Sequence, residues 1–211
     1  MKEQTYTQFI QQVIDGFQPG EPILVRELGN RIAEAYGMEE KKACAAAAVA
    51  VKRLIDTGTC PNLRFFAKGV YYVTKQTVFG ETGINKDKLI ELKYLKDGTG
   101  YETGAAVMHK LSLTTLMPAE RTFVSNSAQH RAKRDDALGI VIRAPRIPVN
   151  KENRFYLQFL DLLNMYDDVP VDAEDPYLLL GRFVQARGLD YGTLLHLADT
   201  HYNGNTIMKL A

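Results

Sequence analysis

The chain of 211 residues is 45% hydrophobic and 24% charged, with a formal net charge of only +1. This composition excludes a disordered chain, and the length suits one large domain or two small ones. The sequence has no apolar run near the length of about 18 residues that a membrane helix needs, and its start lacks a signal-peptide core, so we expect a cytoplasmic protein without a membrane partner.

Hydrophobic spacing predicts two helices and a short strand before residue 38. The first helix is expected from about Thr5 to Phe17, where glycine and proline end it. The segment Pro22–Leu24 is a candidate strand, and a second helix is expected over Arg26–Tyr36. Gly37 then supplies the left-handed residue that commonly ends a helix.

The longest predicted helix covers Glu39–Asp56, and the rest of the chain is organised around it. The side of this helix that faces away from the core is slender and mostly cationic, because small residues lie there among lysines and an arginine. Such a face can enter a DNA groove. Helical spacing places the following residues in one apolar arc toward the core: Ala43, Cys44, Ala47, Val51, Leu54 and Ile55.

Two aromatic and β-branched segments follow this helix. Leu63–Phe66 and Val70–Val73 flank a short turn that contains Gly69, and this pattern predicts a β-hairpin. The order helix, strand, helix, helix, hairpin is that of a winged helix-turn-helix. We therefore predict a winged-helix DNA-binding domain over residues 1–80.

Basic residues of the predicted helix and wing can neutralise DNA phosphates, whereas the small apolar residues offer only contacts to thymine methyl groups. We expect modest direct base readout, aided by DNA shape and by a second copy of the chain in a homodimer. The alternative is that the alanine-rich helix packs against another helix and that its lysines form a solvated rim. The candidate DNA-contacting residues are Lys41, Lys42, Ala45, Ala46, Val49, Lys52, Arg53, Arg64 and Lys68.

Residues 81–211 predict a second domain, a small α/β module with a helical C-terminal part over 149–211. The glycine-rich segment Gly98–Gly104 is interpreted as a tight turn and not as a dinucleotide-binding loop, because its last glycine comes one residue late and the segment follows a helix. The expected elements of the module are helices over 87–96 and 105–111 and strands over 121–125 and 138–143. With the winged helix, the overall fold class is α+β.

Two charged segments of this second domain are candidate contact sites. The polar loop between its strands carries Arg131, Lys133 and Arg134, which we predict to be an accessory phosphate or partner contact. The segment 167–176 holds five acidic residues in ten and either meets a basic partner or is simply solvated. Helices are expected on both sides of it, over 152–166, 177–187 and 191–200, the last after an Asp190 N-cap.

Several strings over about residues 5–148 resemble the AbiEi-type antitoxins of type IV toxin–antitoxin systems and related bacterial regulators. These strings are Phe66–Tyr72, Gly104–Ala106 and Leu111–Pro118, with the strand that follows. The resemblance implies a winged helix that binds its own promoter and a following domain that neutralises a cognate nucleotidyltransferase-type toxin.

Individual residues of this chain match motif positions of that family. Lys68 and Gly69 match the wing turn, and the motif after the middle helix is matched by Thr114, Thr115 and Pro118. Ser112 stands where relatives often have Gly, and Leu116 stands where Gln is common.

Catalytic signals are weak in this sequence. It contains no GxSxG, HExxH or phosphate-loop lysine motif. His196 and His201 diverge by about 140° on a continuous helix, so they cannot share a metal. Ser125, His130 and Asp135 could be arranged as a catalytic triad, but three common residues in and around a polar loop are weak evidence for one. We therefore predict no enzyme activity, no cofactor and no metal, and expect Cys44 and Cys60 to be reduced thiols.

Two functions from different classes remain. The first is a DNA-binding transcriptional regulator, an autorepressor of its operon, whose partner is double-stranded DNA. The alternative is a protein-interaction antitoxin whose main role is neutralising a toxin, with DNA binding secondary.

Overall fold

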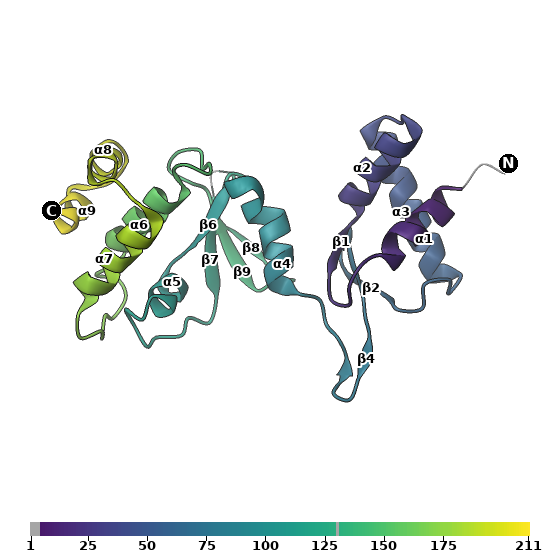
Figure 1. The fold of residues 1–211 in the computed structure, drawn as a ribbon, viewed down its shortest axis with the longest axis horizontal. Helices are drawn as coiled ribbons and strands as arrows, with labels where there is room; N and C mark the ends of the chain where they lie inside the picture. The colour runs from purple at the N-terminus through teal and green to yellow at the C-terminus, as the bar shows by residue number, and fades with distance from the viewer. Residues whose placement is uncertain (1–4, 130) are drawn as a thin grey trace. The chain divides into compact units, whose positions relative to one another are not determined.

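The computed structural model describes residues 5–129 and 131–211 and shows a mixed α+β chain (Figure 1). The chain divides into two compact units, the first ending at Leu89 and the second beginning at Ile90. The division predicted after residue 80 falls inside strand β5 (Gly80–Glu81), and the structure places residues 81–89 in the first unit. Among the described residues, no helix is long and apolar enough to cross a membrane.

The first unit contains the predicted helices and strands, each within two residues of its expected ends. Strand β1 pairs antiparallel with β3, and β3 pairs antiparallel with β2, which gives the order β1-β3-β2. Thr5 and Gln8 form a reciprocal capping box at the start of the first helix, and Gly37 ends the second with φ of 62°. The elements are α1 (Tyr6–Asp15), β1 (Pro22–Leu24), α2 (Val25–Tyr36), α3 (Glu40–Asp56), β2 (Leu63–Ala67) and β3 (Val70–Val73).

Small residues bring α2 and α3 into close contact in the core of the first unit. A Cβ atom on Gly29 would lie 2.6 Å from the Sγ atom and 2.8 Å from the Cα atom of Cys44. On α3, the residues facing the core are Ala43, Ala47, Ala50, Val51 and Leu54, all at most 2% exposed. Alanine and glycine at this crossing therefore let the two backbones approach each other.

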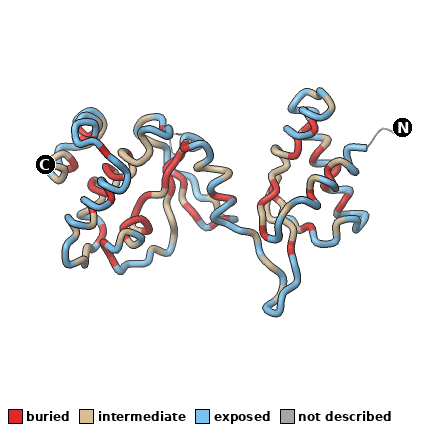
Figure 2. Tube along the Cα trace, in the orientation of Figure 1, coloured by how far each residue is buried: buried red, intermediate tan, exposed pale blue. Residues whose placement is uncertain are grey.

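A second hairpin, which the sequence did not predict, follows the first. Its strands are β4 (Gln76–Thr77) and β5 (Gly80–Glu81). The Thr77 hydroxyl donates to the Gly80 carbonyl at 2.7 Å, and the Lys75 amide donates to the Thr82 hydroxyl at 2.9 Å. Two apolar residues form the tip, and the hairpin is mostly exposed (Figure 2).

The second unit is built on a four-stranded sheet of order β6-β7-β9-β8. Strands β7 and β9 are parallel, and the other two pairs are antiparallel. The strands are β6 (Gly100–Thr103), β7 (Arg121–Ser125), β8 (Lys133–Asp135) and β9 (Ile140–Arg143). The predicted strands over 121–125 and 138–143 are confirmed as β7 and β9.

Helices cover both faces of this sheet. The π-helical segment η1 (Glu91–Leu95), which continues α4 (Lys86–Ile90), packs on one face, where the Ser125 hydroxyl donates to the Tyr94 carbonyl at 2.7 Å. Helix α6 (Arg154–Asn164) packs on the other, where the Tyr101 hydroxyl donates to Asp161 at 2.8 Å. The remaining helices are η2 (Lys96–Gly98), α5 (Ala105–Lys110), α7 (Pro176–Arg187), α8 (Tyr191–His201) and α9 (Gly204–Leu210).

Two predictions for the second unit were wrong. The glycine-rich segment is not simply a turn, because Gly100–Thr103 forms strand β6 beside β7. A Cβ atom on Gly100 would lie 2.5 Å from the Tyr94 carbonyl oxygen and 2.6 Å from that of Val124, so this glycine permits a close approach inside the sheet. The polar loop contains the edge strand β8. Helix α9 lies within the C-terminal part predicted to be helical, although no separate helix was specified there.

Candidate nucleic-acid interface

Most of the predicted contact residues on α3 lie on one exposed side of that helix. Val49, in the middle, is 51% exposed although it is apolar. Ala46 is the exception, because it is half-buried and packs against the core of the first unit. The exposed members are Lys41, Lys42, Ala45, Val49, Lys52 and Arg53.

The contacts of the alanine-rich face of α3 explain why its cationic face stays exposed. Helices α1 and α2 pack on the alanine-rich face, so the helix is held without using its cations. Two residues of the predicted core arc are less buried than expected. Cys44 is half-buried against Gly29, and Ile55 is 38% exposed near the helix end.

Four cations of the predicted interface have no ion pair with any described residue, so their charge can act on an external anion. They are Lys41, Lys52, Arg53 and Lys68. Lys42 lies 3.6 Å from Glu39, but both side chains are well exposed, and such surface pairs contribute little to stability. Lys68 lies in the β2–β3 turn, next to Gly69 with φ of 74°.

Arg64 differs from these cations because the first unit already neutralises it. Its Nη2 and Nε atoms donate to the two carboxylate oxygens of Glu81 at 2.6 and 3.2 Å, and its Nη1 donates to the Pro61 carbonyl at 2.7 Å. The hydrogen bond from Arg64 lowers the pKa of Glu81, so the pair is charged at neutral pH. Arg64 therefore joins β2 to the β4–β5 hairpin within the first unit.

The accessory cations of the second unit are divided between the two faces of β8. Arg131 and Lys133 line one cavity of about 640 Å³ together with Tyr94 and Gln129. Arg134 follows Lys133 in the sequence but pairs with Glu120 at 2.7 Å and with Asp136 at 3.1 Å. Because successive strand residues point to opposite faces, the three predicted residues do not form one patch.

Asp135 anchors η1 to the edge of the sheet. Lys93 Nζ and the Tyr94 hydroxyl both donate to its Oδ2 atom, at 2.7 and 2.6 Å. Burial would raise the pKa of Asp135, but these hydrogen bonds outweigh burial and lower the pKa from its ordinary value of 3.8.

The described residues of the candidate triad Ser125, His130 and Asp135 make other contacts. Ser125 donates to the Tyr94 carbonyl and Asp135 binds η1, while His130 lies outside the described residues. Among the residues that the structure describes, no group of three or more His, Cys, Asp or Glu side chains could hold a metal ion. Cys44 and Cys60 are free thiols, and burial raises the pKa of Cys60.

The acidic segment of the second unit is largely used by the fold itself. Asp167 pairs with Lys209 at 2.6 Å, and Asp175 caps α7 by accepting from the Leu178 amide at 2.9 Å. Asp172 accepts from the Thr115 amide at 3.1 Å, which joins this segment to the motif after α5. Only part of the segment's charge is therefore available to a partner.

Ser112 adopts a left-handed backbone, with φ of 59°. This is the conformation that glycine favours. No protein-family model matches this chain, and no curated protein matches it.

Proposed function

We propose that the first unit is a winged helix-turn-helix domain that binds double-stranded DNA, and that the chain is a transcriptional regulator that represses its own operon, as AbiEi-type antitoxins do. One observation carries this proposal. Helix α3 is held by α1 and α2 through small apolar residues, while its opposite side presents Lys41, Lys52 and Arg53 without ion-pair partners among the described residues.

The arrangement of elements supports the same assignment. Helix α2 leads into α3 through Gly37 and a short connection, and β2 and β3 form a hairpin whose turn carries the exposed Lys68. In this proposal α3 enters the major groove and the hairpin is the wing that contacts the adjacent backbone. Ala45 and Val49 leave room for close approach and offer contacts to thymine methyl groups only.

Most of the affinity then comes from phosphate neutralisation, so binding must depend strongly on salt. We expect a second copy of the chain to bind a second half-site, because one such domain offers few base contacts.

The test is a titration of labelled duplex DNA from the region upstream of the gene, carried out at several salt concentrations. The double variant Lys42→Ala/Arg53→Ala should bind roughly 30-fold more weakly at 0.15 M salt, and the exponent of the salt dependence should fall by about 2. The control is Lys151→Ala/Arg182→Ala, which removes two exposed charges from the second unit. Unchanged binding and an unchanged salt exponent in the α3 variant would exclude α3 as the recognition helix.

A second function, capture of a toxin protein, is favoured by the tip of the β4–β5 hairpin. Val78 and Phe79 are 94% and 99% exposed, on a hairpin that is fixed by hydrogen bonds and by the Arg64–Glu81 pair. Exposed, preorganised aromatic residues are typical anchors in protein interfaces.

Co-expression with a nucleotidyltransferase encoded next to the gene tests this second function. The wild type should restore growth and co-purify with the enzyme, and Val78→Ser/Phe79→Ser should do neither. Met208→Ser, which alters an apolar side chain that is 77% exposed in α9, is the control. No rescue by the wild type would remove the toxin-capture function and leave the DNA-binding proposal standing.

A further inference from the structure

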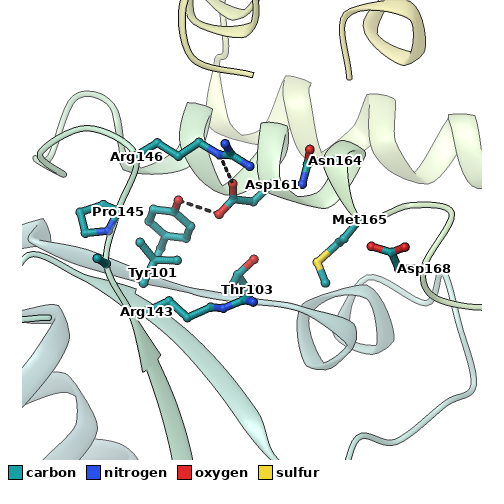
Figure 3. A pocket seen from close by; sticks show the side chains of 11 residues that line it. Tyr101, Thr103, Arg143, Pro145, Arg146, Asp161, Asn164, Met165 and Asp168 are labelled. Carbon is teal, nitrogen blue, oxygen red and sulfur yellow. Dashed lines mark hydrogen bonds and ion pairs between the residues drawn. The ribbon is translucent and has the colours of Figure 1, made fainter. Parts of the chain in front are cut away.

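A polar cavity of about 390 Å³ lies within the second unit, between the sheet and α6 (Figure 3). Val124 of β7 and Arg143 of β9 lie at the carboxyl ends of the two parallel strands, where open α/β sheets commonly bind ligands. Its volume is in the range of small-molecule sites. Thr103, Arg146 and Asp161 also line it.

The buried acid in the wall of this cavity already has its partners. The Tyr101 hydroxyl donates to Asp161 Oδ2 at 2.8 Å, and the Tyr202 hydroxyl donates to Oδ1 at 2.9 Å. Arg146 Nε lies 3.9 Å from Oδ1, and its guanidinium stacks over the Tyr202 ring at 4.5 Å. Asp161 is therefore a fixed part of the wall, and it positions Arg146 at the edge of the cavity.

Three other donors that line the cavity have no partner among the described residues. Arg143 is exposed and makes no ion pair. Thr103 is 4% exposed, yet its hydroxyl makes no hydrogen bond. Asn164 uses its Oδ1 atom to accept from Asn203 and Thr206 at 3.2 Å each, which turns its NH₂ group toward Met165 (Figure 3).

Unpartnered donors beside two arginines match the chemistry of an oxyanion. We propose that this cavity binds a small molecule that carries a phosphate monoester or carboxylate group, with Arg143, Thr103 and the Asn164 NH₂ group donating to its oxygens. Arg146 supplies a second, fixed positive charge. Asp168, which also lines the cavity, faces the part of the ligand that is neutral or carries hydrogen-bond donors.

A small ligand fits this cavity better than the backbone of a nucleic acid. Asp161 and Asp168 both line it, and Asp167 lies beside Asp168 in the chain. These carboxylates would repel a continuous polyanion, whereas a single oxyanion can meet the arginines alone. The proposal does not depend on the DNA-binding function of the first unit.

Isothermal titration of the full chain tests the proposal, with inorganic phosphate, glycerol 3-phosphate, AMP and succinate as probes. Glycerol and adenosine are the matched uncharged compounds. The charged probes should bind and the uncharged ones should not, and the stronger series identifies the ligand as a phosphate or a carboxylate. No binding by any charged probe at about 10 mM, which corresponds to only about 3 kcal/mol of binding free energy, would overturn the proposal.

Variants locate the site. Arg143→Ala should weaken binding of the best probe at least about tenfold, because a charge-assisted hydrogen bond is lost. Arg143→Lys should retain part of the affinity, since the charge remains but the planar fork is lost. Thr103→Val keeps the shape of a buried side chain and should weaken binding about threefold.

Controls separate this site from the candidate DNA interface. Arg182→Ala, in α7, and the α3 double variant should both leave probe binding unchanged. Equal affinity in Arg143→Ala and wild type would overturn the proposal, as would displacement of the bound probe by a short DNA duplex.

Discussion

The two units use their basic residues in different ways. On α3 and in the β2–β3 turn of the first unit, Lys41, Lys52, Arg53 and Lys68 have no ion-pair partner among the described residues. Around the sheet of the second unit, most basic residues are bound internally: Lys93 by Asp135, Lys110 and Arg121 by Glu102, Arg134 by Glu120, and Lys209 by Asp167. Arg131, Lys133 and Arg143 are exceptions there, because none of them has an ion-pair partner among the described residues.

This difference shows that the number of basic residues does not indicate how many of their charges lack an internal partner. Residues 76–150 carry eleven Lys and Arg, one more than residues 1–75, yet many of them hold strands and helices together. What separates the two regions is whether an acid lies within reach. Three substitutions test this contrast, beginning with the largest expected effect.

Gly29→Ala disrupts the close contact between α2 and α3. This contact holds α3 in the first unit without using its cations. The added Cβ atom would meet the Cys44 backbone at 2.8 Å, so we expect overpacking to lower the free energy of unfolding of the first unit by about 3 kcal/mol. Hydrogen exchange of the α3 amides measures this separately from the second unit.

The matched control is Gly181→Ala in α7, where no atom lies within 4 Å of the added Cβ. Alanine is the better helix former there, so stability should rise by up to about 1 kcal/mol. If Gly29→Ala is as stable as the wild type, the close α2–α3 contact is wrong.

Asp135→Asn tests the internal use of charge in the second unit. The pKa of Asp135 is lowered in the fold, so its stabilising effect is present above the unfolded-state value of 3.8 and is lost as pH falls through the folded-state pKa. We expect the variant to lose about 1–2 kcal/mol at pH 7 and to match the wild type in acid. Urea unfolding at both pH values measures this, and a loss that does not depend on pH would contradict it.

Glu81→Gln has the smallest expected effect. It removes the ion-pair partner of Arg64 and so leaves Arg64 unpaired, like Lys52 and Arg53 of α3. Without Glu81, Arg64 becomes available, so DNA affinity should rise about fivefold, the contribution of one further phosphate contact. Arg64→Ala should change affinity little, because the wild-type charge is already neutralised. The control in the same DNA titration is Glu174→Gln, which removes an exposed negative charge from the second unit. Equal effects of both Gln variants would contradict a specific role of the Arg64–Glu81 pair.

Much of the first unit could be predicted because its elements are amphipathic and clearly bounded. Pro22–Leu24 and Val70–Val73 have their predicted ends, and Gly37 ends α2 as expected. The sequence could not indicate that Arg64 is paired, since Glu81 lies 17 residues away in the chain, on a hairpin that the sequence did not predict.

The second unit was harder to predict for a specific physical reason. Glycines usually mark turns, but Gly100 lies in a strand because two carbonyl oxygens occupy the space of a side chain. The edge strand Lys133–Asp135 is wholly polar and has no hydrophobic alternation to reveal it. The cavity near Arg143 was missed because its lining comes from β6, β7, the end of β9 and α6, which only the tertiary fold brings together.

The strand order of the second unit has a consequence for its synthesis. Strand β9 lies between β7 and β8, yet it leaves the ribosome after both of them. Until Ile140–Arg143 has emerged, β8 has no partner in this sheet and one edge of β7 stays unpaired. A nascent chain that stalls before residue 140 would therefore expose the hydrogen-bonding groups of β7 to other chains, and co-translational chaperones would be needed longest at this stage.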